Sequence, residues 1–187
     1  GLKIENIPKE IGNHSYSIVF SGFSYNYYDK IKQIYLSETP IRYPLNYGQA
    51  SISGIEMDLL YQPKLKWINF KTYISNYIFS DPLAFQLQPE KMLRNIISIK
   101  HKWFNIYIIH RSESSRQITT LEKNGITKQA TLEPISNIDV SIYREFKIAF
   151  FRSIFSFSGK NLNSKPQRLE GISIFDRRYS LNMNISL

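Results

Sequence analysis

The sequence predicts an all-β fold, an antiparallel up-and-down meander of about eight long strands. Three observations predict it. Apolar and polar residues alternate with a period of two, β-branched and aromatic residues fill the alternating stretches, and the connections between them alternate in length. Because successive side chains of a strand face opposite sides, such alternation gives each strand one apolar and one polar face. We find no amphipathic helix of useful length.

The eight expected strands follow one another along the whole chain. They cover residues 15–29, 47–62, 66–80, 92–101, 103–113, 134–144, 147–160 and 177–187. The last strand shows the alternation most clearly, since only Ser and Asn separate its apolar residues. These apolar residues are Tyr179, Leu181, Met183, Ile185 and Leu187.

Three other strands repeat the pattern. In residues 47–62, Ile55 to Tyr61 alternate with Gly54, Glu56 and Asp58. In residues 134–144, Ile138, Val140 and Ile142 alternate with Asn137, Asp139 and Ser141. In residues 103–113, Phe104, Ile106 and Ile108 share one face. Most expected strands have about 9–11 residues or more, the length that crosses a membrane, whereas strands of soluble proteins average about 5–6.

The connections alternate between long and short. The long ones are residues 30–46, 81–91, 114–133 and 160–176, and the short ones are residues 62–65, 102 and 144–146. In a meander every second connection lies on the same side, so one rim would carry the short turns and the other the long loops. This asymmetry is typical of bacterial outer-membrane barrels. A lipocalin-like barrel or a sandwich remains the soluble alternative.

Composition narrows the function. The 187 residues suffice for one domain, and the absence of cysteine excludes a disulfide scaffold, Cys-ligated zinc and thiol catalysis. No apolar run approaches the about 20 residues of a membrane helix. The net charge of +9 suggests either a nucleic-acid surface or basic loops and a basic inner wall. Lys and Arg are spread along the chain, so we favour the second interpretation and expect no nucleic-acid partner.

No catalytic constellation is visible. His14, His101 and His110 are too far apart in sequence to suggest a local metal motif. Glu56 and Asp58 share a strand face, which suggests either an acid/base pair or the inner wall of a barrel, and we favour the wall. We expect neither an enzyme nor a cofactor.

Two further groups of residues have more than one interpretation. Arg111, Glu113 and Arg116 lead into the longest loop. They would contact an anionic substrate or lipopolysaccharide, or form a solvated loop, and we favour the loop. Trp67 and Trp103 lie beside short turns, so we interpret them as interfacial anchors.

Several segments resemble TonB-dependent receptors. Residues 46–60 resemble the strand pattern N-x-G-x-A-x-x-x-G-x-E of that family. The matching residues are Asn46, Gly48, Ala50, Gly54 and Glu56. Residues 132–143 resemble L-x-P-Y-x-x-L-D-L, with Asp139 at the aspartate. Asn161 and Leu162 begin the segment that corresponds to NLFDK, and Arg178 stands in the place of a Gly-Arg pair. The family usually ends in an aromatic residue, whereas this chain ends in Leu187.

The resemblance implies that residues 1–187 are the C-terminal segment of a transmembrane barrel of about 22 strands, without the plug domain and the earlier strands. Such a receptor takes up a scarce nutrient, such as a ferric siderophore, cobalamin or a glycan, across the outer membrane of a Gram-negative bacterium. The expected partners are membrane lipid and lipopolysaccharide, the barrel-assembly machinery, the TonB complex acting through the plug, and a small nutrient ligand. An autonomous eight-stranded barrel with a structural or adhesive role, or a soluble β-barrel that binds a lipid or nucleic acid, is the alternative.

We predict that the isolated chain is insoluble in detergent-free buffer, since the open edges of a partial barrel promote aggregation. Sedimentation after removal of detergent measures this. A monodisperse monomer in the supernatant would contradict the prediction.

Overall fold

The computed structural model describes residues 1–5, 9–11, 14–36, 41–63, 67–148, 151–163, 167–169, 172–174 and 176–186. It confirms the all-β fold. In the described part of the chain, the only helical element is the 3-10 helix η1 (Pro82–Phe85). No helix there has the length and apolar character needed to cross a membrane.

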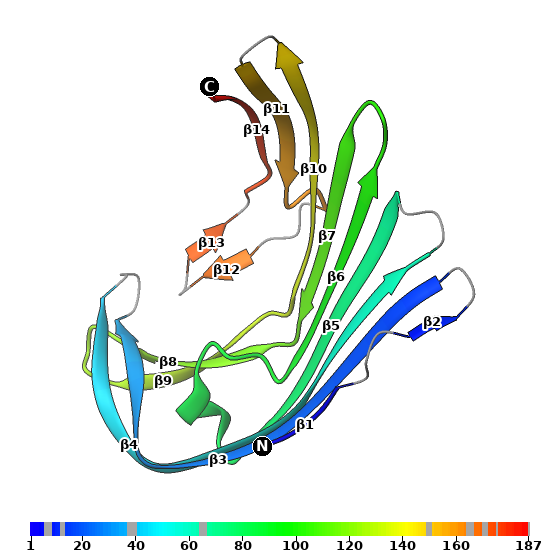
Figure 1. Ribbon diagram of the computed structural model, residues 1–187. Coiled ribbons are helices and arrows are strands. Elements are labelled where there is room, and N and C mark those ends of the chain that lie inside the picture. Colours follow the sequence, from blue (N-terminus) through cyan, green and yellow to red (C-terminus); the bar gives the residue numbers. More distant parts are fainter. Residues whose placement is uncertain are drawn as a thin grey trace.

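Eight strands form a consecutive antiparallel meander, as predicted (Figure 1). In chain order they are β3 (His14–Leu36), β4 (Arg42–Gln62), β5 (Ile68–Phe79), β6 (Lys91–Lys100), β7 (Asn105–Glu113), β10 (Ile135–Ile148), β11 (Phe151–Lys160) and β14 (Arg178–Ser186). The sheet holds together through the backbone hydrogen bonds of these neighbours, because each central strand pairs on both sides.

Six short strands were not predicted. They are β1 (Leu2–Glu5), β2 (Lys9–Ile11), β8 (Arg116–Leu121), β9 (Thr127–Leu132), β12 (Gln167–Leu169) and β13 (Ile172–Ile174). β1 and β2 pair with the outer edge of β3, and β12 and β13 pair with each other inside the connection from β11 to β14. The expected long loop at residues 160–176 therefore contains a small hairpin.

β7 pairs directly with β10, as the meander requires, but the loop expected between them is wrong. Residues 114–133, expected as a loop, form the antiparallel hairpin β8–β9. β8 then pairs in parallel with the end of β3, where Tyr35 is opposite Thr120. Tyr35, Ile118 and Leu132 are buried together there, which gives the hairpin an apolar core of its own. A pattern of period two in each strand says nothing about such a long-range pairing.

The expected loop at residues 30–46 is also wrong, because β3 and β4 continue as a paired hairpin through most of it. The pairing is interrupted by a bulge at Lys30, which lies opposite Gly48. Gly48 has a φ of +87°, a conformation that glycine adopts without steric cost. The bulge therefore lets two long strands bend without losing their pairing.

A third correction concerns the turn expected at residues 144–146. β10 runs through these residues to Ile148, and β11 begins at Phe151. Glu145 accepts a hydrogen bond of 2.9 Å from Arg152, and the ring of Phe146 lies 5.6 Å from that of Phe155. These two cross-strand pairs extend the strand beyond the expected turn. Of the turn expected at residues 62–65, residues 64 and 65 fall outside the described residues.

The sheet is strongly curved and open (Figure 1). Among the described strands, β14 pairs with β11 alone, and nothing joins it to β3, β8 or β9. The connection at residues 101–104 is short, whereas those at 80–90 and 114–134 are long and lie at the opposite rim (Figure 1).

The two faces of the sheet differ in shape. η1 and the β12–β13 hairpin lie within the curve, on the concave side (Figure 1). Ala84 and Phe85 of η1 pack against Ala50 and Ile52 of β4. Because side chains alternate, residues with the parity of Ile52 in β4 face the concave side, and Ile55 to Tyr61 with the opposite parity face the convex side.

Convex-face residues form an apolar band across all eight meander strands. One row of directly opposed residues reads Tyr16, Tyr61, Phe70, Ile97, Ile108, Val140, Gly159 and Tyr179. The next row reads Ile68, Ile99, Ile106, Ile142, Phe157 and Leu181. Leu181 is 77% exposed and Phe157 48% exposed. Asn182 and Asn184 of β14 have the concave parity, as expected for a strand with two unlike faces.

We predict that Gly54→Ala destabilises the sheet. A Cβ at Gly54 would lie 2.5 Å from Cδ1 of Tyr77 and 3.0 Å from the carbonyl oxygen of Asn76. Such overpacking costs about 1–3 kcal/mol. Urea unfolding in detergent micelles measures this change. Gly22→Ala is the matched control, since its Cβ would meet its nearest atom at 4.0 Å. Equal stability of the two variants would contradict the prediction.

Candidate functional site

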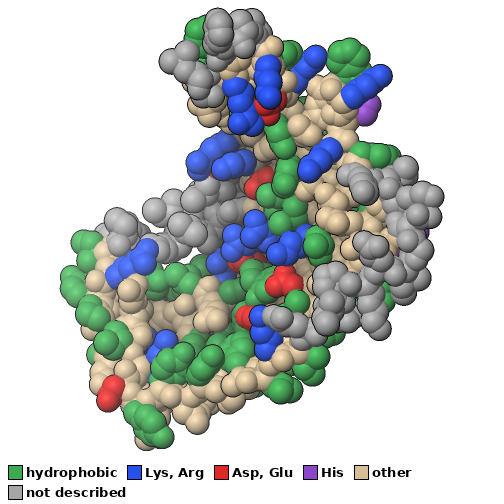
Figure 2. All heavy atoms as spheres, viewed as in Figure 1, with side chains coloured by type: hydrophobic (Ala, Val, Ile, Leu, Met, Phe, Trp, Pro, Cys, Tyr) green, Lys and Arg blue, Asp and Glu red, His purple; other side chains and the backbone are tan. Residues whose placement is uncertain are grey.

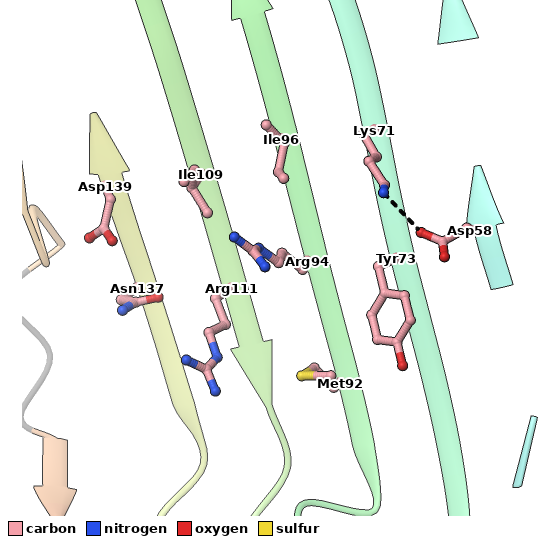
Figure 3. A pocket seen from close by; sticks show the side chains of 10 residues that line it. All are labelled: Asp58, Lys71, Tyr73, Met92, Arg94, Ile96, Ile109, Arg111, Asn137 and Asp139. Carbon is pink, nitrogen blue, oxygen red and sulfur yellow. Dashed lines mark ion pairs between the residues drawn. The ribbon is translucent and has the colours of Figure 1, made fainter. Parts of the chain in front are cut away.

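A row of charged and polar side chains crosses the concave face in register. Asp58, Tyr73, Arg94, Arg111 and Asn137 are directly opposed on β4, β5, β6, β7 and β10. They line a hollow of about 590 Å³. Figure 2 shows basic side chains gathered in the hollowed middle of this face, and Figure 3 shows the lining residues pointing into it. The remaining lining residues are Lys71, Met92, Ile96, Ile109 and Asp139.

Most charges of the hollow are paired. Lys71 lies 3.5 Å from Asp58 (Figure 3), and the Nε of Arg111 donates a hydrogen bond of 2.6 Å to Glu113. Asp139 accepts a hydrogen bond of 2.8 Å from the backbone N–H of Asn161. Arg94 is exposed and has no hydrogen-bond or ion-pair partner among the described residues. The hollow thus presents one unpaired guanidinium.

Below the hollow, a carboxylate is buried between two arginines. Glu113 is 3% exposed and Arg116 is 8% exposed, and Nη1 of Arg116 lies 3.6 Å from Oε2 of Glu113. The interpretation of these residues as a solvated loop is therefore wrong. Arg116 is the first residue of the β8–β9 hairpin, which sequence periodicity does not indicate, and it lies opposite Leu132 of β9. Two nitrogens of its guanidinium, Nε and Nη2, are buried without a hydrogen-bond partner in the described part of the chain.

Glu56 belongs to a tyrosine network on the same face. The hydroxyl of Tyr77 donates a hydrogen bond of 2.7 Å to Glu56, and the hydroxyls of Tyr77 and Tyr73 lie 3.3 Å apart. Asp58, two residues along the strand, is paired with Lys71. Both carboxylates therefore hold neighbouring strands together, which fits a wall better than an acid/base pair.

The family-motif residues of β4 lie along one strand but not in one cluster. The side chain of Asn46 accepts a hydrogen bond of 2.7 Å from the N–H of Gly48, at the bulge. Ala50 is buried against η1. Gly54 lies under the ring of Tyr77. These residues shape the backbone and the packing, and none of them, Glu56 included, lines the hollow.

A second group of motif residues meets at the end of β11. Asn161 is buried and has a φ of +52°. Its backbone N–H donates a hydrogen bond to the carboxylate of Asp139, and the N–H of Leu162 donates a hydrogen bond of 2.8 Å to the carbonyl oxygen of Ile138. These contacts tie the end of β11 to β10. Asp139 is the only residue of this group that also lines the hollow.

The remaining predicted residues lie apart from the hollow. Arg178 begins β14 and forms an ion pair with Asp176. Leu187 lies outside the described residues. Trp67 and Trp103 are exposed beside the short connections, and the guanidinium of Arg144 lies 5.2 Å from the ring of Trp103. No group of three or more metal-ligating side chains occurs in the described part of the chain.

Comparison with known proteins gives no family assignment. No protein-family model matches the chain, and no curated protein matches its sequence significantly.

Sequence reasoning did not identify Lys71, Arg94 and Asn137 as site residues. The sequence signal for Arg94 is its position relative to the short turn at residues 101–104. Arg94 precedes this turn by as many residues as Arg111 follows it. An antiparallel hairpin sets such residues opposite each other. The sequence pattern predicts this turn at residue 102 alone, and a shift of one residue in the turn changes every cross-strand partner.

We predict that Glu113→Gln is strongly destabilising, because it leaves the buried Arg116 without its counter-charge. Breaking a buried ion pair costs about 3–5 kcal/mol. Urea unfolding in detergent micelles measures the loss. Asp58→Asn is the control, since that pair has side chains 53% and 44% exposed and such pairs contribute about 1 kcal/mol or less. The prediction fails if the two variants lose the same stability.

Proposed function

We propose that this chain forms part of the barrel wall of an outer-membrane receptor of the TonB-dependent type, the C-terminal part. In this proposal it contributes wall and outer loops to the uptake of a scarce nutrient, such as a ferric siderophore, cobalamin or a glycan. The observation that carries the proposal is the apolar band, which is in register across eight strands on the convex face of a curved sheet. The order of the sequence motifs along the chain supports the TonB-dependent type in particular.

The apolar band suits contact with lipid. No described element packs over it, and its residues at the β11–β14 end are largely exposed. Contiguous apolar surfaces of this kind mark membrane or protein contact sites, because exposing apolar surface to water is unfavourable in free energy. Six of the meander strands, β5 to β7, β10, β11 and β14, have 9–14 residues, enough to cross a bilayer with tilt.

The concave face suits a wet lumen. Its central row carries Asp58, Arg94 and Arg111, and polar residues of β11 and β14 have the same parity in another row, with Ser156 opposite Asn182. A soluble barrel would place the apolar set inside a dry core and the polar set outside, which is the reverse arrangement. A receptor barrel makes and breaks no bond, so its inner wall needs groups that bind a ligand and no catalytic residues.

The alternative of an autonomous eight-stranded barrel needs β14 to pair with β3. The outer edge of β3 already pairs with β1, β2 and β8. Direct pairing of β14 with β3 would require displacing these three strands. We propose lipid and lipopolysaccharide, the barrel-assembly machinery, and the TonB complex acting through a plug as partners.

We predict that single cysteines on the convex face report lipid. The chain contains no cysteine, so each substitution gives one labelling site. With the encoded protein reconstituted in vesicles, a bimane label at Phe157→Cys or Leu181→Cys should be quenched by brominated lipid. Labels at the concave partners Ser156→Cys and Asn182→Cys should be quenched by aqueous iodide instead.

The two sites of each comparison are neighbours in one strand, so depth and local structure are matched. Iodide quenching of all four labels without lipid quenching would refute the membrane proposal. Lipid quenching at Ser156→Cys and Asn182→Cys would mean that the faces are reversed.

A further inference from the structure

We propose that the concave hollow binds an oxyanion, a carboxylate or phosphate group, between Arg94 and Arg111. This inference deepens the proposed function by naming a ligand chemistry for the inner wall. It rests on that function only in expecting the hollow to face an aqueous lumen, since the site itself follows from the side chains on the sheet.

The first argument is the direct opposition of two arginine residues in the sheet. Arg94 and Arg111 are cross-strand partners on β6 and β7, and both side chains line the hollow (Figure 3). Like charges directly opposite each other destabilise a sheet. A ligand oxyanion between them would turn this repulsion into two charge-assisted hydrogen bonds, the geometry that guanidinium groups prefer.

The second argument is that the nearby carboxylates are occupied. Asp58 pairs with Lys71, and Glu113 lies between Arg111 and Arg116. Asp139 faces the hollow and accepts the N–H of Asn161. Four cations, Lys71, Arg94, Arg111 and Arg116, thus stand against three carboxylates, which leaves one positive charge.

The third argument is the buried guanidinium of Arg116. It contacts Glu113 with one nitrogen, while Nε and Nη2 are buried with no acceptor among the described residues. Glu113 therefore divides its charge between two arginines, and Arg111 is left incompletely neutralised. Arg111, whose charge is incompletely neutralised, is the member of this group that lines the hollow, where it lies opposite Arg94.

Neutral groups complete the site. Tyr73 and Asn137 flank the two arginines in the same row and offer a hydroxyl and an amide. Met92, Ile96 and Ile109 supply apolar walls, which strengthen charge pairing by excluding water. The hollow of about 590 Å³ exceeds a single phosphate, so the oxyanion would be one group of a larger ligand. That group has two possible sources, a free small molecule or an acidic side chain of the protein itself.

The test uses malonate and inorganic phosphate as probes on the encoded protein in detergent micelles. Phenylglyoxal modifies arginine, and mass spectrometry reads the modification rate of Arg94 and of Arg111 separately. We expect either probe to slow both rates in a saturable manner. With Arg94→Gln, the dissociation constant read from protection of Arg111 should rise about tenfold or more.

Two further variants separate the site from general charge. Arg144→Gln removes the same charge from the opposite face and should leave the dissociation constant unchanged. Arg94→Lys keeps the charge but loses the planar fork, so it should give an intermediate value.

Each outcome decides the proposal. Saturable protection that Arg94→Gln weakens supports a small-molecule source. Slow modification of Arg94 without any probe, accelerated in 1 M salt, supports the same site with an acidic side chain as the source. Rapid modification of Arg94 that no probe slows overturns the proposal. Because micelles replace the bilayer, this result is independent of the quenching test, and failure of one does not imply failure of the other.

Discussion

The structure depends on the register of its long strands. Apolar and polar side chains alternate along each strand. The register of the backbone pairing from β3 to β14 places the apolar residues of neighbouring strands on the same face of the sheet. A slip of one residue between any two strands would turn the apolar set of one strand to the concave side. The two-faced sheet is therefore specified twice, by the hydrogen-bond ladder and by the pattern of each strand.

This constraint decides where further elements can pack. The convex face carries the apolar band and beside it a polar row of Thr72, Asn95 and His110, whereas η1 and the β12–β13 hairpin lie on the concave side (Figure 1). Phe85 of η1 stacks on Phe79 of β5 with ring centroids 5.1 Å apart, and Tyr27 approaches it at 5.8 Å. Aromatic contacts thus fill the concave side near the long connections, while the charged row fills its middle. The inner face is divided along its length into a packed part and an open part.

The sequence predicts the parts of this arrangement that are local. Alternation at Tyr179 to Ile185 defines a strand and its faces without knowledge of any neighbour, and eight such segments with alternating connections define a meander. It does not predict the parallel pairing of Tyr35 with Thr120, because the partners are 85 positions apart and no pattern in either segment indicates its partner. It misplaces Arg116 for the same reason, since that residue begins the β8–β9 hairpin, which sequence periodicity does not indicate.

Local prediction also stops short of the site itself. The polar character of Arg94 and Arg111 is visible in the sequence, but their opposition depends on the exact position of one turn. The same register that aligns the apolar band on one face aligns two like charges on the other, where cross-strand repulsion is unfavourable. A sheet under no other requirement would gain stability from an acidic residue at either position. The pair lies beside a buried carboxylate already divided between two arginines, and negative charge from outside the sheet would offset the repulsion between its two members.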